Sequence, residues 1–211
     1  MVDMHSHILF GVDDGARNIT ESREMLAAAK SVGVNRIIAT PHARVDHFDR
    51  RLVDERYAEL REVAAKKGIA LRLGYEVHWN LVLALDGSEY ADFCMANTHQ
   101  MLLEFSLSAD ELPQNHDQVI YRLQRSGISI IIAHPERYRF VQQDCSVAER
   151  WIDMGCRLQL DAVCLLRSRE PKCKATARRL LNAEMYQYAA SDAHCAKDYD
   201  DFGKACARIR K

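Results

Sequence analysis

The stretch that decides the fold is Val2-Asp3-Met4-His5-Ser6-His7, which is followed by Asp13-Asp14. A second stretch with the same kinds of side chain, Ser191-Asp192-Ala193-His194, lies near the other end of the chain. Side chains alternate along a β-strand, so His5 and His7 point to the same face if this stretch is a strand. Neutral imidazole is the commonest protein ligand of divalent transition metals, and carboxylates complete such sites. The two ends of the chain therefore predict one metal site that is assembled from distant strand ends.

Outward from this stretch, apolar strands alternate with helices along the 211 residues. Strands are expected at 1–8, 35–40, 69–76, 101–105, 128–133, 157–160 and 187–190, and helices at 20–32 (with Thr20 as N-cap), 51–67, 117–126, 147–154, 172–182 and 200–210. Continuously apolar strands between helices indicate a parallel sheet whose outer face is covered. About seven such units favour an α/β fold with one compact (β/α)7 barrel, residues 1–211, over an open doubly wound sheet.

Polar side chains of metal-ligand type fall at or just after the ends of the expected strands. They are His5, His7, His42, Glu76, Glu104, His134, Asp192 and His194. In a β/α barrel the C-terminal rim of the strands is where active sites are built. A single histidine has many other roles, but so many consecutive strand ends with such residues are hard to explain by chance. A buried carboxylate such as Glu76 or Glu104 also needs a compensating cation.

Bulk composition excludes several classes of protein. The formal net charge of -1 gives no support to a nucleic-acid binder. No apolar stretch approaches the roughly 18 residues that span a bilayer, so no membrane insertion is expected. Polar residues occupy the place of the apolar core of a secretory signal, and a cytoplasmic location is expected.

Cysteine usage agrees with that location. The seven cysteines contain no Cys-x-x-Cys spacing, and Cys94, Cys156 and Cys164 lie in apolar contexts, so reduced core thiols are expected rather than disulfides. Cys173 and Arg179 match the Cys-x5-Arg spacing of thiol-dependent phosphatases. The intervening residues contain no glycine for an anion-binding loop and are expected to lie in mid-helix, so the match is taken as fortuitous.

Specific motifs then make the chain recognisable. In order along the chain they are Asp3-Met4-His5-Ser6-His7-Ile8-Leu9, Gly11-Val12-Asp13-Asp14-Gly15-Ala16, Thr40-Pro41-His42, Gly74-Tyr75-Glu76, Leu102-Leu103-Glu104-Phe105, Ala133-His134-Pro135-Glu136-Arg137-Tyr138 and Ser191-Asp192-Ala193-His194. This pattern resembles the polymerase and histidinol phosphatase (PHP) superfamily, and within it the capsule-type, manganese-dependent tyrosine phosphatases similar to CpsB and YwqE. The resemblance covers nearly the whole chain and implies a distorted, TIM-like PHP barrel.

The resemblance also implies a site for three metal ions. Its implied ligands are His5, His7 and Asp192 for the first ion, Glu76 as a bridge to a second ion with Glu104 and His134, and Asp14, His42 and His194 for a third. Family precedent favours Mn²⁺. The ligand types alone are equally compatible with Fe or Zn, because imidazole and carboxylate suit all three.

Clustered dications lower the pKa of bound water and neutralise phosphoryl oxygens. Arg137 follows His134 closely and is expected to bind phosphate oxygens through its planar guanidinium, the alternative being a salt bridge to Asp13 or Glu136. A tyrosine leaving group, with a pKa of about 10, needs little help from a general acid. His194 and Asp14 are the candidates for that proton donor.

The implied activity is hydrolysis of phosphotyrosine on the tail of a bacterial tyrosine autokinase that controls capsule or exopolysaccharide synthesis. Two alternatives remain open: a small-molecule phosphomonoesterase of the histidinol-phosphatase type, and a non-catalytic, metal-bound regulator of the kinase. A homo-oligomer is left open as well.

After the Ser-Asp-x-His motif the chain departs from the family pattern. Members of the family usually continue through a longer segment that contains a second phosphate-binding arginine. Here Lys197 is the only nearby cation in the sequence, and a C-terminal tail shorter than is usual ends at Lys211. Lys197 is therefore the candidate to replace that arginine as a point charge.

Overall fold

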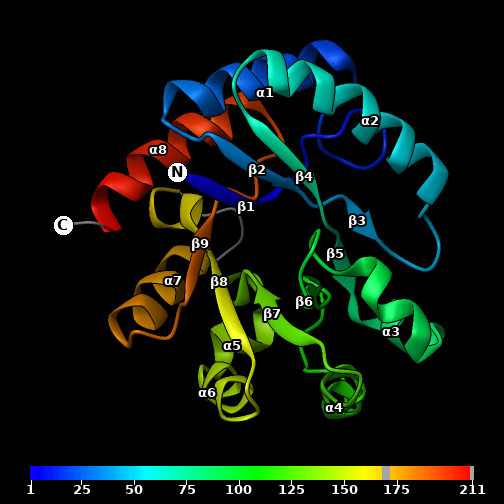
Figure 1. Cartoon of the computed structure of the whole chain (residues 1–211). Helices are drawn as coiled ribbons and strands as arrows, with labels where there is room; N and C mark the ends of the chain where they lie inside the picture. The colour runs from blue at the N-terminus through cyan, green and yellow to red at the C-terminus, as the bar shows by residue number, and fades with distance from the viewer. Residues whose placement is uncertain (168–171, 210–211) are drawn as a thin grey trace.

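Parallel strands surrounded by helices form the molecule, as the computed structural model shows for residues 1–167 and 172–209 (Figure 1). One sheet has the order β1-β2-β4 and the other the order β3-β5-β6-β7-β8-β9, and every pairing between these strands is parallel. The strands are β1 Val2–Ser6, β2 Arg36–Ala39, β3 His42–Ala43, β4 Ala70–Leu73, β5 Glu76–His78, β6 Gln100–Glu104, β7 Ser129–Ala133, β8 Arg157–Asp161 and β9 Tyr188–Ala190.

The two sheets together make one distorted barrel. A short break separates β2 from β3 and another separates β4 from β5, so each pair is one interrupted strand that runs from the first sheet into the second. The barrel closes where His7 N donates to Ala193 O (2.9 Å) and Asp192 N donates to His5 O (3.0 Å). Counting each interrupted pair once, the described strands fill seven positions, and the predicted (β/α)7 architecture is confirmed.

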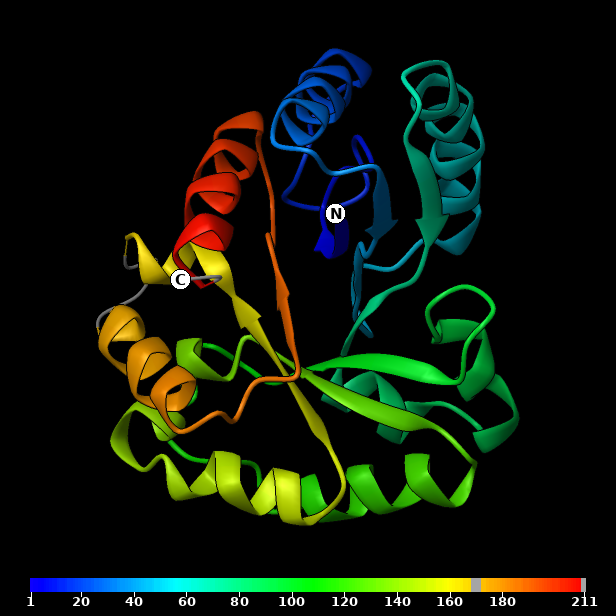
Figure 2. The same cartoon turned by 60° about the vertical axis from the view of Figure 1, so that its left-hand side comes forward.

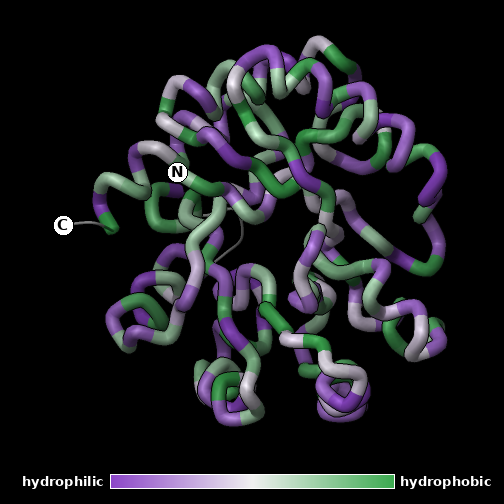
Figure 3. Tube along the Cα trace, viewed as in Figure 1, coloured by the Kyte–Doolittle hydropathy of each residue, from purple (hydrophilic) through white to green (hydrophobic). Residues whose placement is uncertain are grey.

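Helices cover the outside of the barrel on all sides in two views (Figures 1 and 2). The α-helices are α1 Ile19–Ser31, α2 Arg50–Lys66, α3 Trp79–Ala84, α4 His116–Arg125, α5 Arg139–Gln143, α6 Ser146–Asp153, α7 Cys173–Asn182 and α8 Ala196–Ile209, and the 3-10 helices are η1 Gly87–Phe93, η2 Pro135–Arg137 and η3 Ala162–Leu165. Hydrophilic and hydrophobic residues alternate along these outer helices (Figure 3), as expected for helices with one face on the barrel and one in solvent.

The interruptions in the strands were not predicted from the sequence. The expected strand at 69–76 is split at Gly74, where a Cβ atom would approach Ile38 and Met95 to 3.2 Å. The neighbouring strand is split at Pro41, which has no N–H to donate to a sheet. As a result His42 and Glu76 each begin a new strand and are paired directly across β3 and β5.

The start of the first helix also differs from the prediction. Helix α1 begins at Ile19, and its N-cap is Asn18, whose side chain accepts hydrogen bonds from the backbone N–H groups of Thr20 and Glu21. The prediction of Thr20 as the N-cap is therefore wrong, because Thr20 is the second residue of the helix. Asparagine and threonine both satisfy orphan N–H groups well, so spacing alone did not discriminate between them.

An aromatic cluster supports the rim of the barrel from outside. Phe105, directly after β6, stacks on Trp151 with ring centroids 5.2 Å apart, and its backbone N–H donates to the Tyr138 hydroxyl at 3.0 Å. Tyr138 is fully buried and follows η2. The cluster therefore ties the end of β6 to the segment that follows β7, and the polar residues at these two strand ends are held in fixed relation.

The expectation that all cysteines are reduced is wrong for one pair. Cys164 in η3 and Cys173 at the start of α7 form a disulfide between two buried residues. Cys94 and Cys156 are free and buried, as predicted. Cys173 begins its helix rather than lying in the middle of it. Because its sulfur is bonded to Cys164, it offers no thiolate, and the Cys-x5-Arg match remains without chemical meaning.

Among the described residues, no helix combines the length and the apolar character needed to pass through a lipid bilayer.

Candidate metal centre

The structure brings all the predicted ligand residues to the C-terminal mouth of the barrel. Four overlapping groups have one ligand atom per residue within 4.8 Å of one another. They are His7–Asp14–His42–His194, His5–Glu76–His134, His5–His7–Asp192 and His42–Glu76–Glu104. These residues come from β1, β3, β5 and β6, from the loop after β1, and from the segments that follow β7 and β9.

The expected first set is brought together directly. The Nε2 atoms of His5 and His7 lie 3.2 Å apart, and Asp192 Oδ1 lies 3.2 and 3.3 Å from them. All three side chains are buried. Three ligand atoms at this spacing surround a point at which one cation could contact all of them.

Glu76 lies at the centre of the cluster. Its Oε1 is 2.7 Å from His134 Nε2, while its Oε2 is 3.0 Å from His42 Nδ1 and 3.3 Å from His7 Nε2. A carboxylate with its two oxygens facing different imidazoles is suited to bridge two ions. Glu76 Oε2, which faces the imidazoles, is also a buried atom without a hydrogen-bond partner, which is the condition expected of an atom whose partner is a metal.

The second expected set is divided differently in the structure. Glu104 Oε2 lies 3.7 Å from His42 Nδ1 and groups with His42 and Glu76, whereas His134 groups with His5 and Glu76. Glu76 is common to both groups, so it connects them.

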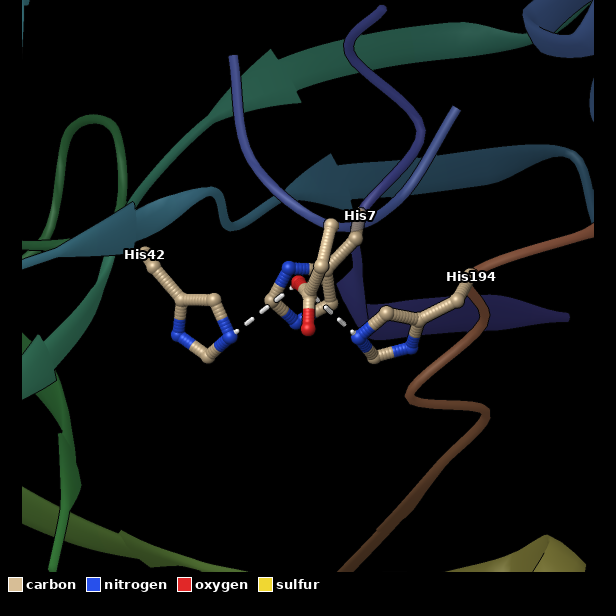
Figure 4. Close-up of side chains that lie close together, drawn as sticks. His7, His42 and His194 are labelled. Atoms are coloured by element: carbon tan, nitrogen blue, oxygen red, sulfur yellow. Dashed lines mark ion pairs between the residues drawn. The ribbon is translucent and has the colours of Figure 1, made fainter. Parts of the chain in front are cut away.

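The third expected set lies at the outer edge of the mouth. Asp14 Oδ1 is 3.4 Å from both His42 Nε2 and His194 Nε2. Figure 4 shows the rings of His42 and His194 approaching from opposite sides, with the ring of His7 between them. The rings of His7 and His194 are stacked with their centroids 4.2 Å apart. Asp14 is 68% exposed, unlike the buried ligands behind it.

Electrostatics within the cluster favour a cation. Burial raises the pKa of Glu104, and the nearby Glu76 carboxylate raises it further, to about 7. Burial by itself lowers the pKa of His42, but Glu76 outweighs that effect and holds this pKa at about 9. Burial opposes the ionisation of Glu76, yet His5 and His42 lower its pKa well below the usual range. Protons held between the imidazoles and the carboxylates balance the negative charge of the cluster, and dications that bind there would displace these protons.

Two residues outside the predicted set orient the inner imidazoles. His7 Nδ1 donates to Asp13 Oδ2 at 2.7 Å, and His5 Nδ1 donates to Gln159 Oε1 at 2.9 Å. Both bonds leave Nε2 directed at the cluster, which is the usual way in which metal-ligating histidines are fixed. Sequence reasoning considered Asp13 only as a partner of Arg137, and it missed Gln159, because a glutamine in β8 carries no signal of its own.

Arg137 lies at the end of η2 and forms an ion pair with Asp192. The two partners suggested as alternatives are engaged elsewhere: Asp13 bonds to His7, and Glu136 accepts hydrogen bonds from the Tyr186 hydroxyl and the Asp161 N–H, both at 2.8 Å. The guanidinium therefore faces the metal centre.

A second arginine at the cluster was missed. Arg44 Nη2 lies 3.1 Å from Glu104 Oε2 and 3.3 Å from the ring nitrogens of His42. Arg44 directly follows β3, and its position two residues after His42 puts both side chains on the same side of an extended segment, which is the signal that could have found it.

Backbone conformation adds support for a functional site. His134 and Asp192 have positive φ values of 29° and 46°. Non-glycine residues in this region are strained, and such strain collects at active sites. Gly15 packs directly on His7, because a Cβ atom there would lie 2.0 Å from the His7 carbonyl oxygen.

Lys197 lies at the start of α8, beside the outer edge of the cluster. It lines a cavity of about 450 Å³ with Asp14 and His194. The structure adds a second cation near this helix: Arg167 bonds to Asp198 and, at 3.1 Å, to Asp201. Asp198 in turn accepts a hydrogen bond from the His194 N–H at 2.9 Å. Both cations are thus connected to the segment that carries His194.

The parallel β/α barrel, with imidazoles and carboxylates gathered at its C-terminal mouth, is a distorted, TIM-like barrel with a candidate metal centre. The model of one protein family, described as capsular polysaccharide synthesis, CpsB/CapC, matches residues 1–211. The chain belongs to this CpsB/CapC family.

Curated relatives agree with the family. The tyrosine-protein phosphatase YwqE of Bacillus subtilis (strain 168) is 32% identical over 201 residues, which cover 93% of this chain and 78% of YwqE. The putative tyrosine-protein phosphatase CapC of Staphylococcus aureus is 32% identical over 199 residues, 92% of this chain and 77% of CapC. The tyrosine-protein phosphatase CpsB of Streptococcus pneumoniae is 30% identical over 207 residues, 92% of this chain and 83% of CpsB.

Solved structures agree with the fold. A structure from work on YwqE of B. subtilis and CpsB of S. pneumoniae, described as unique metal-dependent tyrosine phosphatases, matches with a TM-score of 0.85 and 29% identity, covering 100% of this chain and 86% of that one. The putative histidinol phosphatase hisK of Listeria monocytogenes matches with a TM-score of 0.59 at 11% identity, covering 94% of this chain and 97% of that one, and shows the fold alone.

Proposed function

We propose that this protein is a metal-dependent protein-tyrosine phosphatase of capsule synthesis and that its substrate is the phosphotyrosine tail of a bacterial tyrosine kinase. The observation that carries the proposal is the convergence of imidazoles and carboxylates on Glu76 at the barrel mouth. Curated relatives with this activity support it over nearly the full length of the chain. The expected cytoplasmic location stays a prediction.

The residues present fit a cluster of dications. The unpartnered Glu76 oxygen, shared protons and oriented imidazoles are all explained if cations occupy the foci between the ligand groups. We assign His5, His7 and Asp192 to one ion, Glu76, Glu104 and His134 to a second that shares Glu76 with the first, and Asp14, His42 and His194 to an outer third. A count of three ions and Mn²⁺ as the native metal remain part of the proposal, which anomalous scattering at the Mn, Fe and Zn edges tests directly.

Arg137 is proposed to bind the phosphate. Its guanidinium already faces the centre through Asp192, and its planar fork matches two phosphate oxygens. When bound, dications supply hydroxide at neutral pH and neutralise charge on the phosphoryl group. The identity of the proton donor to the leaving tyrosine oxygen stays a prediction. His194 and Asp14 are also assigned to the outer ion, and neighbouring imidazoles hold the pKa of Asp14 low, which favours its role as an ionised ligand.

A phosphate-release assay tests the function. The chelated protein, with and without added Mn²⁺, is given a phosphotyrosine peptide and, in parallel, histidinol phosphate. We expect Mn²⁺-dependent turnover of the peptide, and its loss in His5→Ala and His7→Ala variants. His99→Ala, at an exposed position, is the matched control. Metal-independent turnover that survives the two substitutions refutes the mechanism. Faster turnover of histidinol phosphate supports a small-molecule phosphatase, and peptide binding without turnover supports a regulator.

A further inference from the structure

Two cavities meet the metal centre on opposite sides. One, of about 420 Å³, is lined by Glu104 and Arg44 together with Val45, His78 and Leu107. The other, of about 450 Å³, is lined by Asp14 and His194 together with Arg17, Glu21, Glu24 and Lys197. A phosphotyrosine whose phosphate is at the centre must place its ring and its peptide on one of these sides.

The cavity beside Glu104 is suited to an aromatic ring. Val45 stands at its rim with 50% of its surface exposed, although it is a large hydrophobic residue. Leu107 faces the same space, and so does His78, which is held by Asn80 Oδ1 at 2.6 Å and by Ser106 Oγ at 3.1 Å. Rings bind against apolar walls with a few fixed polar groups. Among the described residues that line the cavity beside Asp14, none has a large apolar side chain.

The Glu104 cavity also continues away from the centre. Leu107 and Ser108, in the connection from β6 to α4, line both it and a further cavity of about 450 Å³. The walls of this further cavity include Arg139, Gln142 and Lys172. Two adjoining cavities with a common wall form one groove that leads out from the metal centre, as the substrate segment of a protein requires. We call it the Leu107 groove.

The far end of the Leu107 groove is attached to the segment that carries Arg137. Gln142 Nε2 donates to the carbonyl oxygens of Glu136 (2.9 Å) and Arg137 (3.4 Å). These hydrogen bonds therefore fix the position of the groove wall relative to the proposed phosphate-binding arginine.

Charge separates the two sides as well. Among the described residues, the far end of the Leu107 groove is lined by two cations, Arg139 and Lys172, and one acid, Asp110. Arg139 is paired with Asp110 at 3.3 Å in an exposed ion pair, which is weak and exchanges readily for another carboxylate. The described lining of the opposite cavity has three acids, Asp14, Glu21 and Glu24, and two cations, Arg17 and Lys197. The balance of charge therefore favours an acidic peptide on the first side over the second.

We propose that the phosphotyrosine ring lies between Val45 and Leu107 and that the acidic peptide flanking it follows the Leu107 groove to Arg139. This inference rests on the proposed function and makes it more specific. It selects phosphotyrosine with acidic neighbours as the substrate class, and it places the flanking peptide on one side of the metal centre.

The test is a ratio of kcat/KM values, measured with the Mn²⁺-loaded enzyme, for an acidic phosphotyrosine peptide and for p-nitrophenyl phosphate, which is too small to reach Arg139. We expect Arg139→Glu to lower this ratio about fivefold, the scale of one exposed ion pair turned into a repulsion. With a peptide whose acidic residues are replaced by glutamine, the same variant should show no such loss. Arg17→Glu is the matched control, since Arg17 is an exposed arginine of the opposite cavity in an ion pair with Glu21.

A ratio that falls for Arg17→Glu instead places the peptide on the Asp14 side and overturns the inference, as does an unchanged ratio for Arg139→Glu in active enzyme. A Val45→Asp variant gives an independent measurement: KM for the peptide should rise while Mn²⁺ content stays the same, and an unchanged KM contradicts the ring site. Failure of the proposed function would look different, because the wild-type enzyme would then not hydrolyse the phosphotyrosine peptide, whatever the side chain at position 139.

Discussion

The inner and outer faces of the metal centre differ in one respect that governs their chemistry. On the inner face, His5, Glu76 and Asp192 are almost completely buried. On the outer face, His42 and His194 are partly exposed and Asp14 is largely exposed. Burial of an ionised carboxylate is costly unless a cation compensates it, whereas water solvates an exposed one. We therefore expect the charge balance of the inner face to depend on metal more strongly than that of the outer face.

The difference in burial explains how one cluster could bind metal ions tightly and still turn over its substrate. Inner ligands are fixed by second bonds, as His5 is by Gln159 and His7 by Asp13. At the outer edge, Asp14 lies 3.4 Å from each of two imidazoles that are themselves accessible to solvent. We expect inner ions to be held firmly, and the outer position to admit substrate.

Glu76→Gln should have the largest effect. The substitution removes the charge that contacts four imidazoles and keeps the shape of the side chain. We expect bound Mn²⁺ to be lost and kcat/KM to fall by more than about 100-fold, beyond the range typical of residues that only orient ligands. Elemental analysis of the purified protein and the peptide assay measure both. Addition of Mn²⁺ should raise the melting temperature of the wild type but not of the variant.

Glu62→Gln on the exposed surface of α2 is the control for that experiment. Retention of stoichiometric metal by Glu76→Gln would show that Glu76 is a structural carboxylate and would remove the distinction between the faces.

Gln159→Leu should have an intermediate effect. Leucine fills the same space in the core but no longer accepts the hydrogen bond of His5 Nδ1. His5 then rotates more freely, and we expect affinity for Mn²⁺ to fall by about 10- to 100-fold while the protein stays folded. Gln124→Leu is the matched control, because the Gln124 side chain donates to Met154 O at 2.6 Å far from the centre. Equal Mn²⁺ affinity in wild type and Gln159→Leu, measured by titration of the chelated protein, would contradict the orienting role.

Gln159 also marks the limit of what the sequence predicts. Strand ends, motifs and helix alternation were sufficient to predict the barrel and the residues that gather at its mouth, because metal-ligand residue types at strand ends are a visible signal. Gln159 carries no such signal, because it acts through a bond to His5, which is distant in sequence. Arg44 carries only a weak one, its spacing from His42, and its bond to Glu104 joins residues that are distant in sequence. The Cys164–Cys173 disulfide was missed for the same reason, because their spacing indicates no pairing.

The breaks in the strands could not be predicted from the sequence either. The split between β4 and β5 depends on the close approach of Gly74 to Ile38 and Met95, which is a tertiary contact. The pairing of His42 with Glu76 across β3 and β5 follows from these breaks and not from hydrophobic pattern. Sequence reasoning therefore predicted which residues meet, whereas their grouping, with Glu104 beside His42 and His134 beside His5, depends on packing.

Asp14→Asn should have the smallest effect of the three and tests the outer face directly. Asp14 is exposed, so its replacement leaves no buried charge, and the amide oxygen remains a weak ligand. We expect the melting temperature and the inner Mn²⁺ ions to be unchanged, the outer ion to be weakened, and kcat/KM to fall by about tenfold, within the range of changes that perturb a metal site without removing it. Asp117→Asn is a suitable control, because Asp117 is 67% exposed and also contacts an imidazole, that of His116 at 2.7 Å. If Asp14→Asn instead released all the metal, the two faces would act as one cooperative unit, and exposure would not predict which ligands can be changed without loss of the inner ions.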